Sequence, residues 1–111
     1  MGRPHSEKFV RPSRNDELPI YFSRLSELKE AALYYDQKEK GLGIIFLDEI
    51  DAVVERILRF PHAWHPTSVR TRRCRTHRFP FGLLYQIRSD EILITAVMDL
   101  RRHPRRWREL L

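Results

Sequence analysis

The sequence predicts a single small α+β domain in which a helical hairpin packs on a mostly antiparallel sheet. Two runs near the C-terminus, 81–87 and 92–98, are rich in β-branched and aromatic residues and are separated by a short polar break, as in a hairpin. Two segments with helical spacing of apolar residues precede them, at about 25–38 and 42–60. A chain of 111 residues is long enough for one core without disulfides. The predicted order is strand, helix, helix, three strands and a short C-terminal helical turn.

The chain begins with a polar segment, 1–18, that contains three arginines and two prolines but few apolar residues. Such a composition buries too little surface to offset the entropy of ordering, so we expect a disordered N-terminal tail. The folding domain is therefore expected to span 19–111.

A short apolar run, 19–22, is expected to form the first strand. Ser23 or Ser26 is then a candidate N-cap for a helix that continues to about Lys38. Gly41 ends this helix or its loop. The apolar residues at helical spacing in this segment are Leu25, Leu28, Ala32 and Tyr35.

The second helical segment has the clearer apolar stripe, and Pro61 ends it. Carboxylates occupy its other faces, so we expect the helix to bury its apolar stripe against a sheet. Its members are Leu42, Phe46, Ile50, Val53, Ile57 and Phe60. We expect four of these, Phe46, Ile50, Val53 and Ile57, to lie in the core.

The segment 69–78 reads as a strand loaded with arginine. Neither of its alternating faces is apolar for long, which is typical of a strand at a sheet edge. The run 92–98 is apolar on both faces and is expected to be an interior strand. Arginine provides planar, bidentate pairing with carboxylates and phosphates. The arginines of this segment are Arg70, Arg72, Arg73, Arg75 and Arg78.

The net positive charge comes from the C-terminal half of the chain. Lysines and arginines minus carboxylates give 10 − 11 for residues 1–61 and 11 − 4 for residues 62–111, where every cation is arginine. A one-sided field of this kind favours nucleic acid or an acidic protein as partner, whereas the plainer interpretation is a solvated surface.

Several classes of protein are disfavoured by the sequence. Cys74 is the single cysteine and has no His or Cys at zinc-ligand spacing, so neither a disulfide framework nor a metal site is expected, and no motif suggests a cofactor. The longest apolar run is too short to cross a membrane, and no signal peptide is recognisable. We expect a cytoplasmic protein.

The last segment, 99–111, adds further arginines around a turn that Pro104 opens. Two tryptophans near arginines are candidate interface anchors. The residues expected to bind a target or partner are Arg70, Arg72, Arg73, Arg75, Arg78, Arg101, Arg102, Arg105, Arg106, Trp64 and Trp107.

A series of short motifs resembles the RelE/ParE superfamily of toxins from bacterial type II toxin-antitoxin modules, and most closely its ParE-like branch, often called plasmid stabilisation proteins. The likeness extends over about 20–107. The motifs in order are Tyr34-Tyr35, Gly-Leu-Gly at 41–43 followed by Phe46, Glu-Arg-Ile at 55–57, Pro61, Arg-Phe-Pro-Phe at 78–81, Leu-Leu-Tyr at 83–85, and Arg-Arg-His-Pro-Arg-Arg-Trp at 101–107.

The resemblance implies a compact toxin that a cognate antitoxin neutralises, with a heterotetramer or a larger complex as an allowed assembly. ParE-like relatives bind DNA gyrase and are not nucleases. RelE-like relatives are mRNA endonucleases that act on the ribosome, which is the alternative. A degenerate, non-toxic member of the family is a third interpretation.

The ribonuclease alternative needs cations and an acid-base pair. Candidate catalytic residues are Arg73, Arg75, Arg78, His77, Tyr85 and His103. Tyr85 lies on a strand face with apolar neighbours, so core packing is the stronger expectation for it, and Asp99 is expected to pair with nearby arginines. Plentiful arginine without a credible acid or base favours binding over cleavage.

Overall fold

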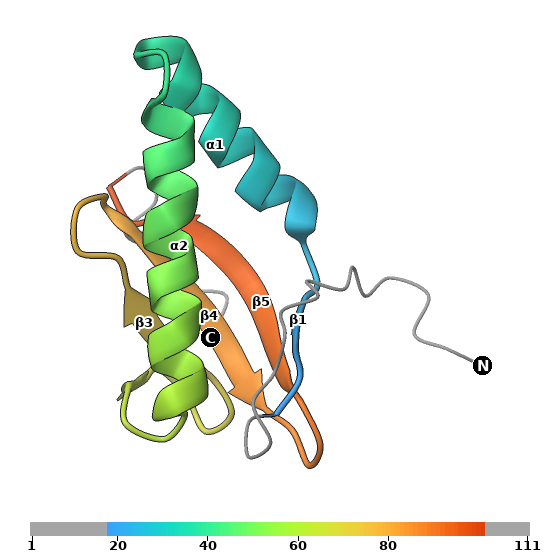
Figure 1. The fold of residues 1–111 in the computed structure, drawn as a ribbon. Helices are drawn as coiled ribbons and strands as arrows, with labels where there is room; N and C mark the ends of the chain where they lie inside the picture. The colour runs from blue at the N-terminus through green and yellow to red at the C-terminus, as the bar shows by residue number, and fades with distance from the viewer. Residues whose placement is uncertain (1–17, 102–111) are drawn as a thin grey trace.

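The computed structural model describes residues 18–101, in which two helices lie on one face of a five-stranded sheet (Figure 1). The elements in chain order are β1 (Ile20–Phe22), α1 (Leu25–Lys38), α2 (Leu42–Arg59), β2 (His65–Pro66), β3 (Arg72–Arg75), β4 (Phe81–Ile87) and β5 (Ile92–Asp99). The predicted tail lies almost entirely outside these residues, as does the predicted C-terminal helical turn.

The sheet has the strand order β1-β5-β4-β3-β2. It is mixed, because β1 runs parallel to β5 while the other neighbours pair antiparallel. We predicted three strands after the helices, and the structure has four, because the two-residue β2 is an additional strand. A strand of two residues leaves no alternation to detect in the sequence. β2 also takes the edge position expected for the basic strand, whereas β5 is interior as predicted.

The α2 stripe forms the centre of the core. Phe46, Ile50, Val53 and Ile57 are buried as predicted, each at most 3% exposed. Phe60 is 57% exposed, so its assignment to the stripe was wrong. The helix ends at Arg59, and Phe60 has the non-helical φ of −138° that turns its side chain off the stripe.

The two glycines of the helical hairpin serve different purposes. Gly41 has a φ of +91°, a left-handed conformation that favours glycine, and lets the chain reverse between the helices. At Gly43 a Cβ atom would lie 2.6 Å from the main-chain oxygen of Ala32. The absence of a side chain there lets the two helices approach closely.

The start of α1 differs from the prediction. Its N-cap is Arg24, which makes no side-chain capping hydrogen bond. The Ser23 hydroxyl instead donates to the Ile94 carbonyl at 3.1 Å, and the Ser23 amide donates to the same oxygen. Ser23 therefore joins the end of β1 to β5, and tertiary contact outweighs local capping at this position.

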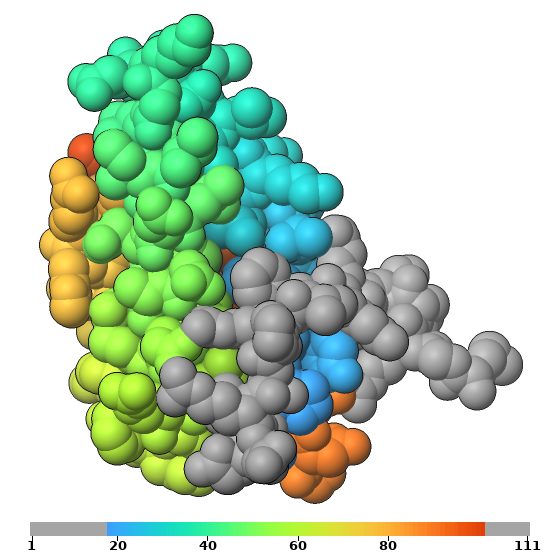
Figure 2. Space-filling model, viewed as in Figure 1, coloured from blue at the N-terminus to red at the C-terminus, as the bar shows by residue number. Residues whose placement is uncertain are grey.

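The two faces of the sheet have separate apolar clusters. The larger cluster lies between the sheet and the two helices. Figure 2 shows that side chains of α1 and α2 adjoin over this face of the sheet. The smaller one, on the opposite face, consists of Leu84, Ala96 and Met98 with Leu100 packed against it. We call this opposite side the outer face.

Candidate functional site

The arginines of the basic strand are divided between the two faces of the sheet. Directly opposed residues in antiparallel strands share a face. Arg73 is opposite Leu84 and Arg75 is opposite Gly82, so both belong to the outer face. Arg72 is opposite Tyr85, on the helix-covered face. The regular strand covers four residues of the predicted ten, which is why Arg70 and Arg78 lie beyond its two ends.

Arg72 has a structural role. Its Nη1 donates to the carbonyl oxygens of His62 and Trp64, at 3.0 and 2.8 Å. The indole Nε1 of Trp64 donates in turn to the main-chain oxygen of Arg56 at 3.1 Å. These bonds attach the loop after α2 to the sheet, so Arg72 and Trp64, both predicted as contact residues, hold the fold together.

Arg73 and Arg75 form the basic part of the outer face. The stem of Arg73 passes over Gly82, where a Cβ atom would lie 3.4 Å from its Cγ. Burial, and then the neighbouring charge of Arg75, lowers the pKa of Arg73 from its ordinary value. Arg75 is exposed, and its carbonyl oxygen accepts a 2.7 Å hydrogen bond from Nη2 of Arg56. The outer face thus carries two adjacent guanidinium groups beside an apolar cluster.

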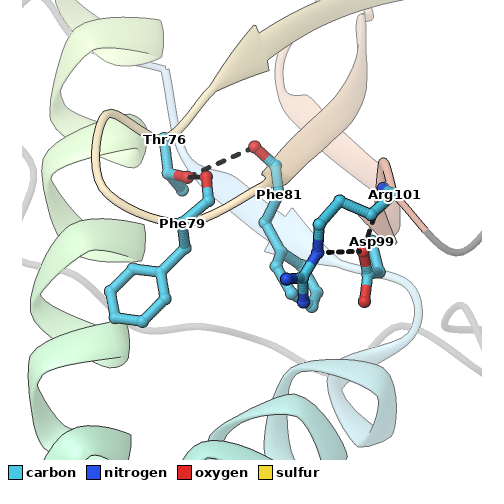
Figure 3. Close-up of polar contacts among 5 residues, drawn as sticks. All are labelled: Thr76, Phe79, Phe81, Asp99 and Arg101. Atoms are coloured by element: carbon cyan, nitrogen blue, oxygen red, sulfur yellow. Dashed lines mark hydrogen bonds and ion pairs between the residues drawn. The ribbon is translucent and has the colours of Figure 1, made fainter.

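The turn between β3 and β4 is held by its own threonine (Figure 3). The hydroxyl of Thr76 donates to the carbonyl oxygens of Phe79 and Phe81, and its amide donates to Phe81 as well. The ring of Phe79 packs against Tyr35 and Phe46 in the core. The turn has a fixed shape because Thr76 holds its main chain by hydrogen bonds and the Phe79 side chain is packed in the core.

Glu49 of α2 fixes the exposed side of the same turn. One of its carboxylate oxygens accepts the amides of His77 and Arg78, at 3.2 and 3.0 Å. Both side chains are exposed at this end of the sheet. Asp99 accepts from the Arg101 amide at 3.0 Å and lies 3.8 Å from its Nε, which agrees with the expected pairing (Figure 3).

Tyr85 belongs to the core. It is fully buried, and its hydroxyl donates to the Pro61 carbonyl at 2.6 Å. Burial is the largest of the effects that raise the pKa of Tyr85 far above its ordinary value. The expectation of core packing is confirmed, and a phenol so placed is ill suited to exchange protons with a ligand at neutral pH.

An open cleft of about 570 Å³ lies at the start of β3, at the opposite end of that strand from the β3–β4 turn. Sequence reasoning did not single out Arg88, which lines it together with Arg70 and Arg72. It likewise missed Glu49 and Arg56, whose bonds to the β3 region are long-range and leave no local pattern. The lining residues are His62, Pro66, Ser68, Val69, Arg70, Arg72, Gln86, Ile87 and Arg88.

Some predicted site residues lie outside the described residues, namely Arg102, His103, Arg105, Arg106 and Trp107. Within residues 18–101, no group of three or more His, Cys, Asp or Glu side chains is arranged to hold a metal ion. No helix in that range is both long and apolar enough to span a bilayer.

Comparison with known proteins gives one clear relationship. A comparison with curated proteins finds no match. The family model for the ParE toxin of the parDE type II toxin-antitoxin system matches residues 24–107, which include both helices and all strands except β1. The match extends over most of the chain, and the strand, helical hairpin and sheet are consistent with a RelE/ParE-like toxin fold. The chain belongs to the family of ParE toxins of type II toxin-antitoxin systems.

Proposed function

We propose that this toxin stops growth by binding an essential target, DNA gyrase, through the outer face of its sheet, and that a cognate antitoxin neutralises it. The observation that carries the proposal is the pair of guanidinium groups, Arg73 and Arg75, that β3 places together on this face. Arginine is enriched among the residues that contribute most to the energy of protein interfaces. Membership of the ParE family implies the antitoxin partner.

The chemistry of the described residues favours binding over RNA cleavage. Cleavage requires a group that accepts or donates a proton within reach of the cations. Tyr85 is buried on the other face and has a raised pKa. Asp99 is engaged with Arg101. Two of the residues considered for acid-base or ion-pair chemistry are therefore committed to the structure.

One observation favours the ribonuclease alternative. His77 and Arg78 are adjacent and exposed on a turn that Glu49 fixes from α2. A rigid turn bearing an imidazole and a guanidinium supplies one proton-transfer group and one cation. This alternative predicts that the purified toxin cuts mRNA on translating ribosomes and that His77→Ala abolishes the cutting.

The deciding experiment is inducible expression without the antitoxin, with pulse labelling of DNA and protein synthesis in the same cells. The gyrase proposal predicts an early fall in DNA synthesis, filamentous cells and inhibition of supercoiling by purified toxin. An early fall in protein synthesis with cut mRNA would refute it in favour of the ribonuclease. Unimpaired growth at normal toxin levels would leave the interpretation of a degenerate, non-toxic member.

A matched pair of variants tests the proposed surface. Arg73→Ala with Arg75→Ala should abolish inhibition of supercoiling, because it removes the two cations that β3 contributes to the outer face. The control, Arg24→Ala with Arg59→Ala, removes the same charge from exposed positions at the ends of the helices. Equal loss of inhibition in both would refute a specific role for the outer face.

A further inference from the structure

The cleft at the end of β3 gathers cations from separate parts of the chain. The loop between β2 and β3 contributes Arg70, β3 contributes Arg72, and the β4–β5 turn contributes Arg88. Figure 1 shows the loops before β3 and the β4–β5 turn at the same end of the sheet. No Asp or Glu among residues 18–101 lines the cleft. Its lining therefore attracts an anion.

Hydrogen bonds hold two of these guanidinium groups in place. Arg72 is fixed by the carbonyl oxygens of His62 and Trp64, as described above. Arg88 donates through Nη2 to the side-chain oxygen of Gln86 at 3.0 Å, and the Gln86 amide donates to the hydroxyl of Thr71 at 3.3 Å. Positioning by neutral partners orients the guanidinium groups without cancelling their charge.

A tight loop presents the third arginine. The Thr71 carbonyl oxygen accepts the amides of Thr67 and Ser68 and the hydroxyl of Thr67, at 2.8, 3.3 and 3.1 Å. This closed loop places Arg70 at the surface. Its neighbour Val69 is fully exposed, an unusual position for a β-branched apolar side chain. The loop therefore offers a cation and an apolar contact together.

We propose that this cleft binds a phosphate group of a nucleic-acid strand. Arginine forks match the oxygen geometry of phosphate, and three of them line one cleft. The cleft is of the size that accepts a nucleotide-sized ligand. Val69 and Ile87 provide apolar contacts for the sugar and base that accompany the phosphate. An acidic peptide would pair with the same cations, but its carboxylates would not use the apolar contacts that Val69 and Ile87 provide.

The test is fluorescence anisotropy of the full chain with a labelled single-stranded DNA of about 12 nucleotides. The test variant is Arg70→Ala with Arg88→Ala, which leaves the structural Arg72 in place. We expect each substitution to weaken binding about tenfold, the effect of one lost charge-assisted contact. The slope of log K against log salt should become shallower by about 1.4, or about 0.7 for each phosphate contact on a single strand.

The control is Lys38→Ala with Lys40→Ala, which lowers the net charge equally at the exposed α1–α2 turn, at the other end of α2 from the cleft (Figure 1). Its affinity should stay within about twofold of the parent protein. Thermal melting of every variant verifies that the fold is retained. Equal losses in the two double variants, or no loss in the cleft variant, would overturn the proposal.

Competition decides the source of the anion. Unlabelled DNA should displace the probe far better than inorganic phosphate at the same phosphate concentration and ionic strength. Equal displacement by inorganic phosphate, or stronger displacement by polyglutamate, would overturn the assignment to nucleic acid. The proposal is independent of gyrase as target, since the cleft variant retains Arg73 and Arg75 and its toxicity is measured separately.

Discussion

Replacing Arg72 by alanine should destabilise the protein, whereas the same change at Arg75 should not. Arg72 donates two hydrogen bonds to carbonyl oxygens of the loop after α2, at 3.0 and 2.8 Å. Hydrogen bonds to a charged group contribute about 1.5–3 kcal/mol each when buried, and this side chain is half-exposed. We therefore expect a loss of about 2 kcal/mol in the free energy of unfolding for the pair.

The corresponding fall in melting temperature follows from the size of the chain. Unfolding entropy is about 2.1 cal/mol/K for each residue near 60 °C, or about 0.2 kcal/mol/K for 111 residues. A loss of about 2 kcal/mol then lowers Tm by about 10 °C. Thermal unfolding followed by circular dichroism measures this shift directly.

Two further variants separate the causes. Arg72→Met keeps most of the apolar stem and removes the donors, so it should lose nearly as much stability as Arg72→Ala. Arg75→Ala keeps the main-chain oxygen that accepts from Arg56, and should change the free energy of unfolding by less than about 0.5 kcal/mol. Similar Tm values for the Arg72 and Arg75 variants would refute the assignment of a structural role to Arg72.

Three other predictions follow from the core and the helical hairpin. Burial raises the pKa of Tyr85, so the phenol stays protonated in the folded protein at a pH where it ionises in the unfolded chain. The free energy of unfolding should therefore fall as pH rises above about 10. Denaturant titrations should show a smaller fall for Tyr85→Phe, and an equal dependence on pH in both proteins would contradict the prediction. Gly43→Ala should cost about 2 kcal/mol, because the new Cβ atom meets a main-chain oxygen at 2.6 Å; a Tm equal to that of the parent protein would show that the helices separate freely. Ser23→Ala should cost about 1 kcal/mol through its hydrogen bond to β5, whereas the exposed Ser26→Ala should be nearly neutral; the reverse order in chemical denaturation would restore a capping role for Ser26.

Much of the fold could be predicted because its signals are local. The spacing of Phe46, Ile50, Val53 and Ile57 identified α2 and its buried face, since a helix repeats every 3.6 residues. β4 and β5 were predictable from runs rich in β-branched and aromatic residues, and the apolar character of both faces of β5 reflects its interior position. β2 escaped notice because two residues carry no periodicity.

The candidate site was less predictable, because its geometry depends on contacts between distant parts of the chain. Strand alternation alone puts Arg73 and Arg75 on one face and Arg72 on the other, and the pairing of β3 with β4 agrees. Nothing near Arg72 in the sequence indicates that its partners are the carbonyls of 62 and 64, and nothing near Arg88 indicates that it shares a cleft with Arg70.

The sequence by itself determined the class of fold, the family and the basic character of the second half of the chain. These properties depend on composition, periodicity and short motifs, which are written along the chain. The tertiary structure decided which arginines hold the fold and which face outward. That division depends on the register of β3 against β4 and on where the loop after α2 lies, and both are fixed by long-range packing rather than by neighbouring residues.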